Sequence, residues 1–439
     1  MTESCIPMTG RRHTPTPRSL LTRPAKLSAL AVGTLATCMA LAVGCGAVPG
    51  VTGGSGDDPI TVMTWAPENT AATNKPGMPA LAKAYARWVN ASGGINGHKL
   101  EVLTCNDHND SVAAARCAER AVDANVVAVV GSYSQHSVSF LAPLQGAGIP
   151  YIGGYGITDE EFLSPLSYPV NGGQPALLAG LGQQIADACG PVTLVRPDTI
   201  AGDQLPVLID AGLRTGRHQG AIDQLAPEDA TSYTDHARQA LVRATENPQQ
   251  QGCVVPALGD RTGTFMDSFR RARKDYPGVR TASVLGSVDQ SAIDSTGGKS
   301  GPYENSYVTG WYPVSTDKRW DQMRSVIAKE AFGDNRIDPT DVGVQTTWIA
   351  YTVLREAVES LGDGEVSSRT IRHALNKGLR VDTGGLTPKL SWRFEDMLAD
   401  SEFPRLVNAD VTFQTVRSGQ LTAQRRGFVN MEKTLEQSD

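Results

Sequence analysis

The chain has 439 residues, of which 40% are hydrophobic and 20% are charged, and its formal net charge at pH 7 is −6. Because a single hydrophobic core stops growing at ~250–300 residues, this length predicts two domains. The acidic balance argues against a nucleic-acid partner, since the phosphate backbone repels a negative surface.

The N-terminus has the composition of an export signal. Five basic residues precede a charge-free, largely apolar stretch at residues 27–44, which ends in small residues before Cys45. This order is typical of a cleaved signal, although the apolar stretch is also long enough for a membrane anchor. It resembles a bacterial lipoprotein signal, in which Cys45 receives the lipid. We therefore expect a signal peptide at residues 1–44 and a flexible, glycine- and proline-rich tether at residues 45–59.

Cleavage of this signal would leave 35 basic and 45 acidic residues, a net charge of −10. We expect the mature protein to be extracytoplasmic and attached to the outer face of the cell membrane through its N-terminal lipid. We also expect it to be a monomer.

Cysteine usage agrees with export. Besides Cys45, the mature chain has four cysteines, an even number suited to disulfides in an oxidising compartment. We favour the pairs Cys105–Cys117 and Cys189–Cys253, because the second pair precedes two apolar runs that neighbouring parallel strands would bring together. Four buried free thiols are the alternative. The chain has no C-x-x-C motif, so a zinc site is not expected, and neither is any cofactor.

Strands and helices alternate in the first part of the mature chain. Apolar runs predict strands at residues 60–65, 100–103, 126–130 and 149–152. Apolar residues at helical spacing predict helices at residues 79–90, 111–124 and 138–145. Gly93 and Gly94 are expected to end the first of these helices, and Ser111 to cap the second. This alternation is typical of a parallel sheet with helices on both faces.

The same pattern then begins again. Predicted strands lie at residues 192–195, 221–225, 254–258, 282–285 and 308–311. Predicted helices lie at residues 174–188, 205–213, 233–244, 264–274, 318–331 and 342–361. Residues 411–416 and 427–429 are expected to form a terminal, hairpin-like piece. Two α/β units in succession indicate two lobes of like design.

Five segments carry a likeness to a known family. They are WVNASGGING at residues 88–97, NDHND at 106–110, NVVAVVGSYS at 125–134, AGIPYIGG at 147–154 and TWIAYTVLREAVESLG at 347–362. In this order they resemble the type 1 periplasmic binding proteins, specifically the extracytoplasmic solute-binding proteins of the leucine/isoleucine/valine class. The resemblance implies two Rossmann-like lobes with parallel central sheets, joined by a three-segment hinge. The expected limits are residues 60–171 and 311–390 for lobe 1, and residues 172–310 and 404–430 for lobe 2.

The predicted binding site lies between these lobes. In open parallel sheets, ligands bind beyond the carboxyl ends of the strands, where helix N-termini point. The resemblance places a carboxylate-binding hydroxyl in the loop after the third strand, where Ser134 and Gln135 match best. It places further polar contacts after the fourth strand, where Tyr155 and Thr158 are the candidates. Trp65, at the end of the first strand, is a candidate aromatic wall, with core packing as the alternative.

Acidic residues are also expected at the site. The family places an acidic residue against the ligand ammonium group, and Glu228 or Asp229 stands in that region, with a solvated loop as the alternative. Residues 106–110 are expected to form a turn before the next helix, and a metal site at Asp107 and Asp110 is the alternative.

The resemblance implies a binding protein rather than an enzyme. Such a protein captures a small polar solute, an amino acid or a related compound, by closure of the hinge and delivers it to the permease of an ABC transporter. A sensor lipoprotein of the same fold is the alternative. An exported hydrolase is less well supported, since the chain has neither a G-x-S-x-G nor an H-E-x-x-H motif.

Overall fold

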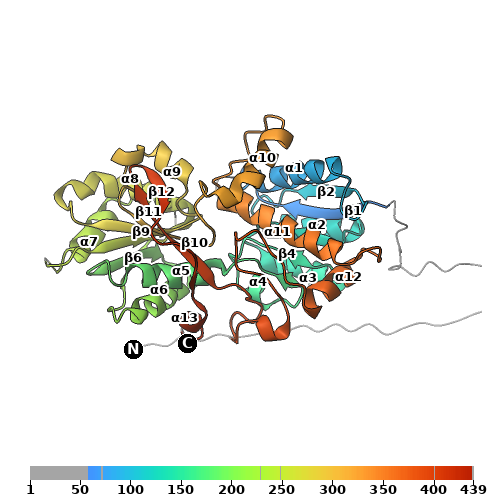
Figure 1. Cartoon of the computed structure of the whole chain (residues 1–439). Helices are drawn as coiled ribbons and strands as arrows, with labels where there is room; N and C mark the ends of the chain where they lie inside the picture. Colours follow the sequence, from blue (N-terminus) through green and yellow to red (C-terminus); the bar gives the residue numbers. More distant parts are fainter. Residues whose placement is uncertain (1–57, 71–72, 228, 248, 400, 438–439) are drawn as a thin grey trace, which may run out of the picture. The chain divides into compact units, whose positions relative to one another are not determined.

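The computed structural model describes residues 58–437, except residues 71–72, 228, 248 and 400 (Figure 1). The predicted signal peptide, Cys45 and most of the predicted tether therefore lie outside the described residues. None of the helices within the described part combines the length and hydropathy that a membrane crossing requires.

The first sheet is parallel throughout and has the strand order β2-β1-β3-β4-β5. Its strands are β1 (Ile60–Trp65), β2 (Leu100–Cys105), β3 (Ala128–Val130), β4 (Tyr151–Ile152) and β5 (Ser167–Tyr168). The register of the first pair sets Ile60 opposite Leu100 and Trp65 opposite Cys105. We call this sheet and the helices that pack on it lobe 1.

Helices cover both faces of this sheet because the side chains of a strand alternate between its faces. Val62 of β1 packs in one core cluster with residues of α1 and α11, and Met63 packs in a second cluster with residues of α2 and α3. The helices of lobe 1 are α1 (Gly77–Ala91), α2 (Ser111–Asp123), α3 (Ser137–Ala147), α4 (Glu160–Leu163), α10 (Asp321–Glu330), α11 (Val342–Glu359) and α12 (Ser368–Lys377).

The second sheet has the order β12-β11-β10-β9-β8-β6-β7, with β13 also paired to β11. Its parallel strands are β6 (Val192–Pro197), β7 (Ile222–Ala226), β8 (Cys253–Pro256), β9 (Arg280–Val284) and β10 (Tyr307–Gly310). Its antiparallel edge consists of β11 (Asp410–Arg417), β12 (Gln420–Ala423) and β13 (Val429–Asn430). We call this sheet and its helices lobe 2.

The antiparallel edge contains the terminal piece that the sequence predicted, because β11 pairs with β13. It also contains β12, which was not predicted. β11 pairs antiparallel with β10, and a two-residue turn at Ser418 and Gly419 joins β11 to β12. Both turn residues have positive φ angles, 53° and 74°. Such a turn suits a tight hairpin, because its twist matches that of the flanking strands.

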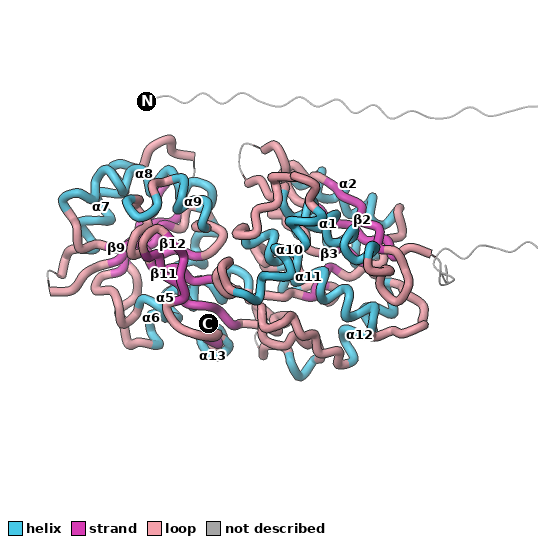
Figure 2. Tube along the Cα trace, turned by 45° about the horizontal axis from the view of Figure 1, so that its top comes forward, coloured by secondary structure: helices cyan, strands magenta, loops and turns pink. Residues whose placement is uncertain are grey.

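The chain passes between the two sheets three times (Figures 1 and 2). The passages lie between β5 and α5, between β10 and α10, and between α12 and β11. α5 contacts β9, β10 and β11, whereas α10 contacts α1. The helices of lobe 2 are α5 (Gly173–Ile185), α6 (Gln204–Thr215), α7 (Thr234–Ala244), α8 (Thr262–Ala272), α9 (Gln290–Ser295) and α13 (Glu432–Leu435).

The two glycines after α1 are required by the backbone. Gly93 and Gly94 have φ angles of 97° and 83°, in the region that glycine tolerates best. A Cβ atom on Gly94 would lie 2.1 Å from the carbonyl oxygen of His98, so a side chain does not fit there. These residues therefore end the helix and turn the chain toward β2, as predicted.

The start of α2 differs from the prediction. The N-cap is Asp110, whose Oδ1 accepts a hydrogen bond of 2.8 Å from the backbone N–H of Ala113, and Ser111 is the first helical residue. A carboxylate at this position also interacts favourably with the positive end of the helix dipole. Within the described residues, no cluster of three or more His, Cys, Asp or Glu side chains is suited to a metal ion.

Both predicted disulfides are present. Cys105 at the end of β2 is bonded to Cys117 in α2, and Cys189 before β6 is bonded to Cys253 at the start of β8. β6 and β8 are parallel neighbours, with Val192 opposite Cys253. This pairing brings the two starts together, as the sequence predicted.

Removal of the disulfides should destabilise the protein unequally. Replacement of Cys189 and Cys253 by alanine should lower the free energy of unfolding by about 4 kcal/mol, because the bond spans a separation of 64 residues. The same change at Cys105 and Cys117 should cost about 3 kcal/mol, because the separation is 12 residues. Urea unfolding under non-reducing conditions measures both losses, and a larger loss for the Cys105–Cys117 pair would contradict this expectation.

Candidate functional site

A cavity of about 220 Å³ lies between residues of the two lobes. From lobe 1 it is lined by the segments that follow β1, β3 and β4. From lobe 2 it is lined by α5 and by the segments at the ends of β8, β9 and β10. The carboxyl ends of parallel strands from both sheets therefore meet at this cavity, where open α/β sheets bind their ligands.

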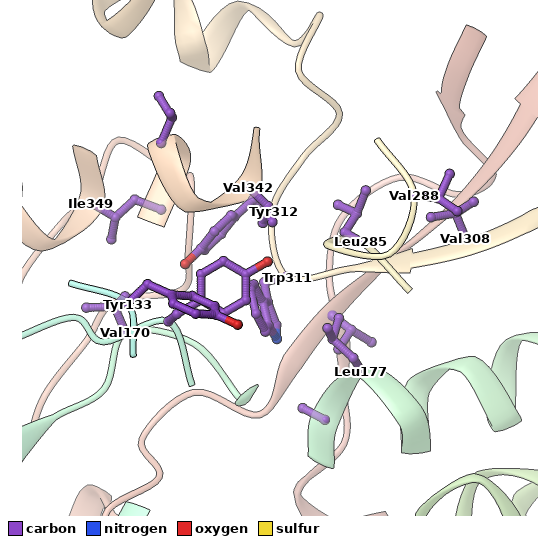
Figure 3. Packing of buried hydrophobic residues seen from close by; sticks show 14 of the residues in the cluster. Tyr133, Val170, Leu177, Leu285, Val288, Val308, Trp311, Tyr312, Val342 and Ile349 are labelled. Atoms are coloured by element: carbon purple, nitrogen blue, oxygen red, sulfur yellow. The ribbon is translucent and has the colours of Figure 1, made fainter. Parts of the chain in front are cut away.

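Three aromatic rings form one wall. The rings of Tyr133 and Tyr155 meet edge to face at 4.9 Å, and those of Tyr155 and Trp311 do so at 5.3 Å. The Trp311 Nε1–H donates to the carbonyl oxygen of Gly173 at 2.9 Å, which fixes the indole against the start of α5. Figure 3 shows Tyr133 and Trp311 close together, with Leu285 on the side of lobe 2.

Aliphatic side chains of lobe 2 form much of the opposite wall. Leu177, Leu178 and Leu181 project from α5. Pro256 is the last residue of β8, and Leu285 follows β9. Burial of apolar ligand surface against such groups contributes about 25 cal/mol per Å². This wall therefore favours a solute with an apolar portion.

Lys75 is the only Asp, Glu, Lys, Arg or His among the described residues that line the cavity. Its Nζ donates to Asp341 Oδ2 at 3.0 Å and lies 5.6 Å from the centre of the Tyr155 ring. Burial alone lowers the pKa of Lys75, but Tyr155 and Asp341 outweigh it and raise the pKa overall. Lys75 is therefore a cation at neutral pH.

The carboxylate of Asp341 is shared between two donors. Its Oδ2 accepts from Lys75, and its Oδ1 accepts from the backbone N–H of Val344 at 3.0 Å, which makes Asp341 the N-cap of α11. The N-terminus of an 18-residue helix carries partial positive charge, and this charge also stabilises the carboxylate.

The loop after β4 is held by a buried carboxylate. Glu161, which is 2% exposed, accepts hydrogen bonds from the backbone N–H groups of Gly156, Ile157 and Thr158 at 3.1 to 3.4 Å. It also accepts from the Thr158 hydroxyl at 3.2 Å. Burial raises the pKa of Glu161 to about 7, although these hydrogen bonds lower it in part. The donors of this loop are therefore used within the protein.

Two of the predicted ligand-binding residues line the cavity. Gln135 is exposed there, and its Nε2 donates to the Tyr133 hydroxyl at 3.2 Å. Tyr155 is 7% exposed and reaches toward lobe 2, where a Cβ atom on Gly286 would lie 2.6 Å from its hydroxyl. Glycine at position 286, with a φ angle of 101°, therefore makes room for this ring.

Ser134 and Thr158 are not among the residues that line the cavity. Ser134 is 1% exposed, and its Oγ accepts from the backbone N–H of His136 at 3.2 Å. A hydrogen bond from Ser134 also lowers the pKa of Asp107 in part, against the larger effect of burial, which raises it. The hydroxyl of Thr158 is bonded to Glu161. Both hydroxyls stabilise the loops that carry the cavity wall.

The remaining candidates lie elsewhere. Trp65 is completely buried and packs against Phe140 and Tyr151 in the cluster that joins β1 to α2 and α3, so the structure places it in the core. Asp229 is exposed and does not line the cavity. Glu228 lies outside the described residues.

Lys75 and Trp311 line the cavity but were not predicted from the sequence. Both follow strands whose carboxyl ends face the cavity, β1 and β10. The candidates predicted from the sequence came from the end of the first strand, from the loops after the third and fourth strands, and from the region of Glu228 and Asp229 in lobe 2. The segment after the first strand was not among them. A basic residue in the segment after the first strand was the signal for Lys75.

Comparisons with known proteins agree with this geometry. A family model described as periplasmic binding protein matches residues 69–402. Among curated proteins, none matches the chain in sequence.

Solved structures share the fold at low sequence identity. An extracellular ligand-binding receptor from Verminephrobacter eiseniae is 17% identical with a TM-score of 0.67, over 83% of this chain and 99% of that one. An ABC transporter solute-binding protein from Rhodopseudomonas palustris, in complex with 3,4-dihydroxybenzoic acid, is 15% identical with a TM-score of 0.65, over 85% and 98%. A leucine-binding protein from Thermotoga maritima is 13% identical with a TM-score of 0.61, over 85% and 99%.

The buried Glu161 should make stability depend on pH near neutrality. Because its pKa in the folded protein, about 7, is above the ordinary value of 4.5, the folded state holds the proton more tightly. Its contribution is therefore complete below about pH 4.5 and is lost as the pH rises through 7, by roughly 3 kcal/mol at most. The difference in unfolding free energy between wild type and Glu161→Gln should shift by this amount between pH 5 and 8.

Urea unfolding at several pH values measures this difference. Glu119→Gln is the matched control, because Glu119 is exposed on α2. Wild type and Glu119→Gln should show the same pH dependence. Parallel curves for wild type and Glu161→Gln would show that Glu161 does not titrate in this range.

Proposed function

Because this chain belongs to the periplasmic binding protein family, we propose that it captures a small organic solute in the cavity between its lobes and delivers it to an ABC transporter permease. The observation that carries this proposal is the cavity itself, which is lined by the carboxyl ends of strands from both sheets. A site built from two lobes can open and close around a solute by hinge motion.

The size of the cavity suits an amino acid or a related compound. Its volume of about 220 Å³ lies slightly below the ~300–1,000 Å³ of sites for drug-sized ligands. The names of structural relatives include leucine and 3,4-dihydroxybenzoic acid, which are solutes of this size. We propose a solute of the same order of size for this chain.

The three passages of the chain between the sheets are the proposed hinge. Lobe 1 would comprise residues 60–171 and 311–390, and lobe 2 residues 172–310 and 404–430. We propose that residues 1–44 are removed as a signal peptide and that Cys45 carries a lipid, with residues 45–59 as a tether. The protein would then act as a monomer on the outer face of the cell membrane and would carry out no catalytic step.

Solute capture is tested by thermal unfolding in the presence of amino acids, the corresponding acids that lack the amino group, and their amides. A solute that binds only the folded protein raises the melting temperature, by an amount equivalent to about 2.7 kcal/mol at a hundred times its Kd. The radius of gyration from small-angle scattering should fall with the same solute. If no compound raises the melting temperature or changes the scattering, the proposal is wrong.

A larger side chain in the cavity should block binding. Ser287 lines the cavity and is half-buried, so Ser287→Phe should fill part of the space and weaken binding at least tenfold. Ser295→Phe is the control, since Ser295 is exposed at the end of α9. Titration calorimetry with any solute found above compares the two variants. Equal affinities would place the binding site elsewhere.

A further inference from the structure

We infer that the solute is a carboxylate with an apolar body and no ammonium group, and that Lys75 is the residue that binds its charge. This inference rests on the proposed function and specifies the class of solute. It follows from three features of the cavity, namely its single cation, the loop donors that are already used, and the absence of an acidic group from its described wall.

Lys75 provides the positive charge. An ammonium group has three N–H donors, and Asp341 accepts from Lys75 Nζ with one oxygen. The negative charge of Asp341 is shared between Lys75 and the start of α11. Its other oxygen accepts from the backbone N–H of Val344, and the N-terminus of that helix has partial positive charge. Lys75 is therefore the full positive charge on the described wall of the cavity, and a solute carboxylate complements it. Asp289, the N-cap of α9, interacts electrostatically with Lys75 but is not among the residues that line the cavity.

The usual alternative for binding an anion is a set of free backbone N–H groups at a loop. Here the N–H groups of Gly156, Ile157 and Thr158 are bonded to Glu161. A carboxylate of the protein already fills the position that a solute carboxylate would take on this loop. These three N–H groups are therefore not free to bind a solute carboxylate. Among the side chains of the described wall, Lys75 has the full positive charge.

Ser283 offers a further polar contact. It lines the cavity from β9, is 1% exposed, and its Oγ has no hydrogen-bond partner among the described residues. A buried hydroxyl without a partner costs about 1–3 kcal/mol, so a polar atom is expected to pair with it when the site is filled. A carboxylate oxygen is a suitable acceptor for this hydroxyl.

An ammonium group on the solute would find no counter-ion. No carboxylate occurs among the described residues that line the cavity. Asp229 is exposed and away from it, and Asp341 is bonded to Lys75 and to α11. A buried, unpaired ammonium group is strongly unfavourable, and Lys75 would repel it. The cavity therefore selects against α-amino acids.

The test compares three solutes that differ in one group each. 4-Methylpentanoate has the carboxylate and an aliphatic body that suits the leucine-lined wall. Leucine adds the ammonium group, and 4-methylpentanamide removes the charge. 3-Phenylpropanoate, phenylalanine and 3-phenylpropanamide form a second set with an aromatic body. Titration calorimetry with the wild-type protein should give each acid a Kd at least about tenfold lower than that of its amino acid and of its amide.

Variants then assign the charge to Lys75. Lys75→Met should weaken binding of the acids at least about tenfold and leave the amides unchanged. Lys83→Met is the control, because Lys83 is exposed on α1. In Lys75→Met alone, the carboxylate of Asp341 would lose its ion-pair partner, which could prevent folding. The double variant with Lys75→Met and Asp341→Asn removes that carboxylate as well, so it tests binding if the single variant does not fold.

Each result decides the inference separately from the proposed function. Equal or tighter binding of leucine or phenylalanine would overturn it while leaving a solute-binding protein. Weakening of amino-acid binding by Glu228→Gln would overturn it in the same way, by assigning an ammonium contact to that residue. Acids that bind no better than their amides would remove the role of Lys75. If neither set binds, the inference fails, and the broader solute panel decides the proposed function.

Discussion

Parallel strand pairing is the constraint on which the site depends. In each sheet it brings the carboxyl ends of neighbouring strands to one edge, and the lining segments after β1, β3, β4, β8, β9 and β10 begin there. Residues far apart in sequence, such as Lys75 and Trp311, therefore meet around one cavity. The antiparallel edge of β11, β12 and β13 extends lobe 2 on the other side of β10.

The two lobes contribute different chemistry. Lobe 1 supplies the charged pair of Lys75 and Asp341, the rings of Tyr133 and Tyr155, and a loop held by Glu161. Lobe 2 supplies mainly aliphatic side chains from α5 and from the ends of its strands. Lys75, Asp341 and Glu161 are tolerated in lobe 1 because each has hydrogen-bond partners. The full charge on the described wall thus comes from lobe 1, and most of its aliphatic surface comes from lobe 2.

Much of the fold was predictable because long apolar runs alternate with amphipathic helices, as in β1 (Ile60–Trp65) and α11 (Val342–Glu359). Strands of two residues, such as β5, carry too few side chains for a periodic signal. The site was less predictable. Side chains alternate between the two faces of β1, and Trp65 lies on the face that α2 and α3 cover. The sequence of β1 does not show which helices cover that face, because this depends on tertiary packing. The hydrogen bond from Thr158 to Glu161 was also not predictable. Glu161 lies in α4, a helix of four residues, which is too short for the sequence pattern to indicate.

Each of the two disulfides lies within one lobe, so oxidation acts on the two halves of the protein separately. One bond joins β2 to α2 within lobe 1, and the other joins the starts of β6 and β8 within lobe 2. Neither bond spans the three connecting segments. An oxidising environment therefore stiffens each half separately and adds no disulfide across the boundary, so the backbone of those segments is the covalent connection between the halves.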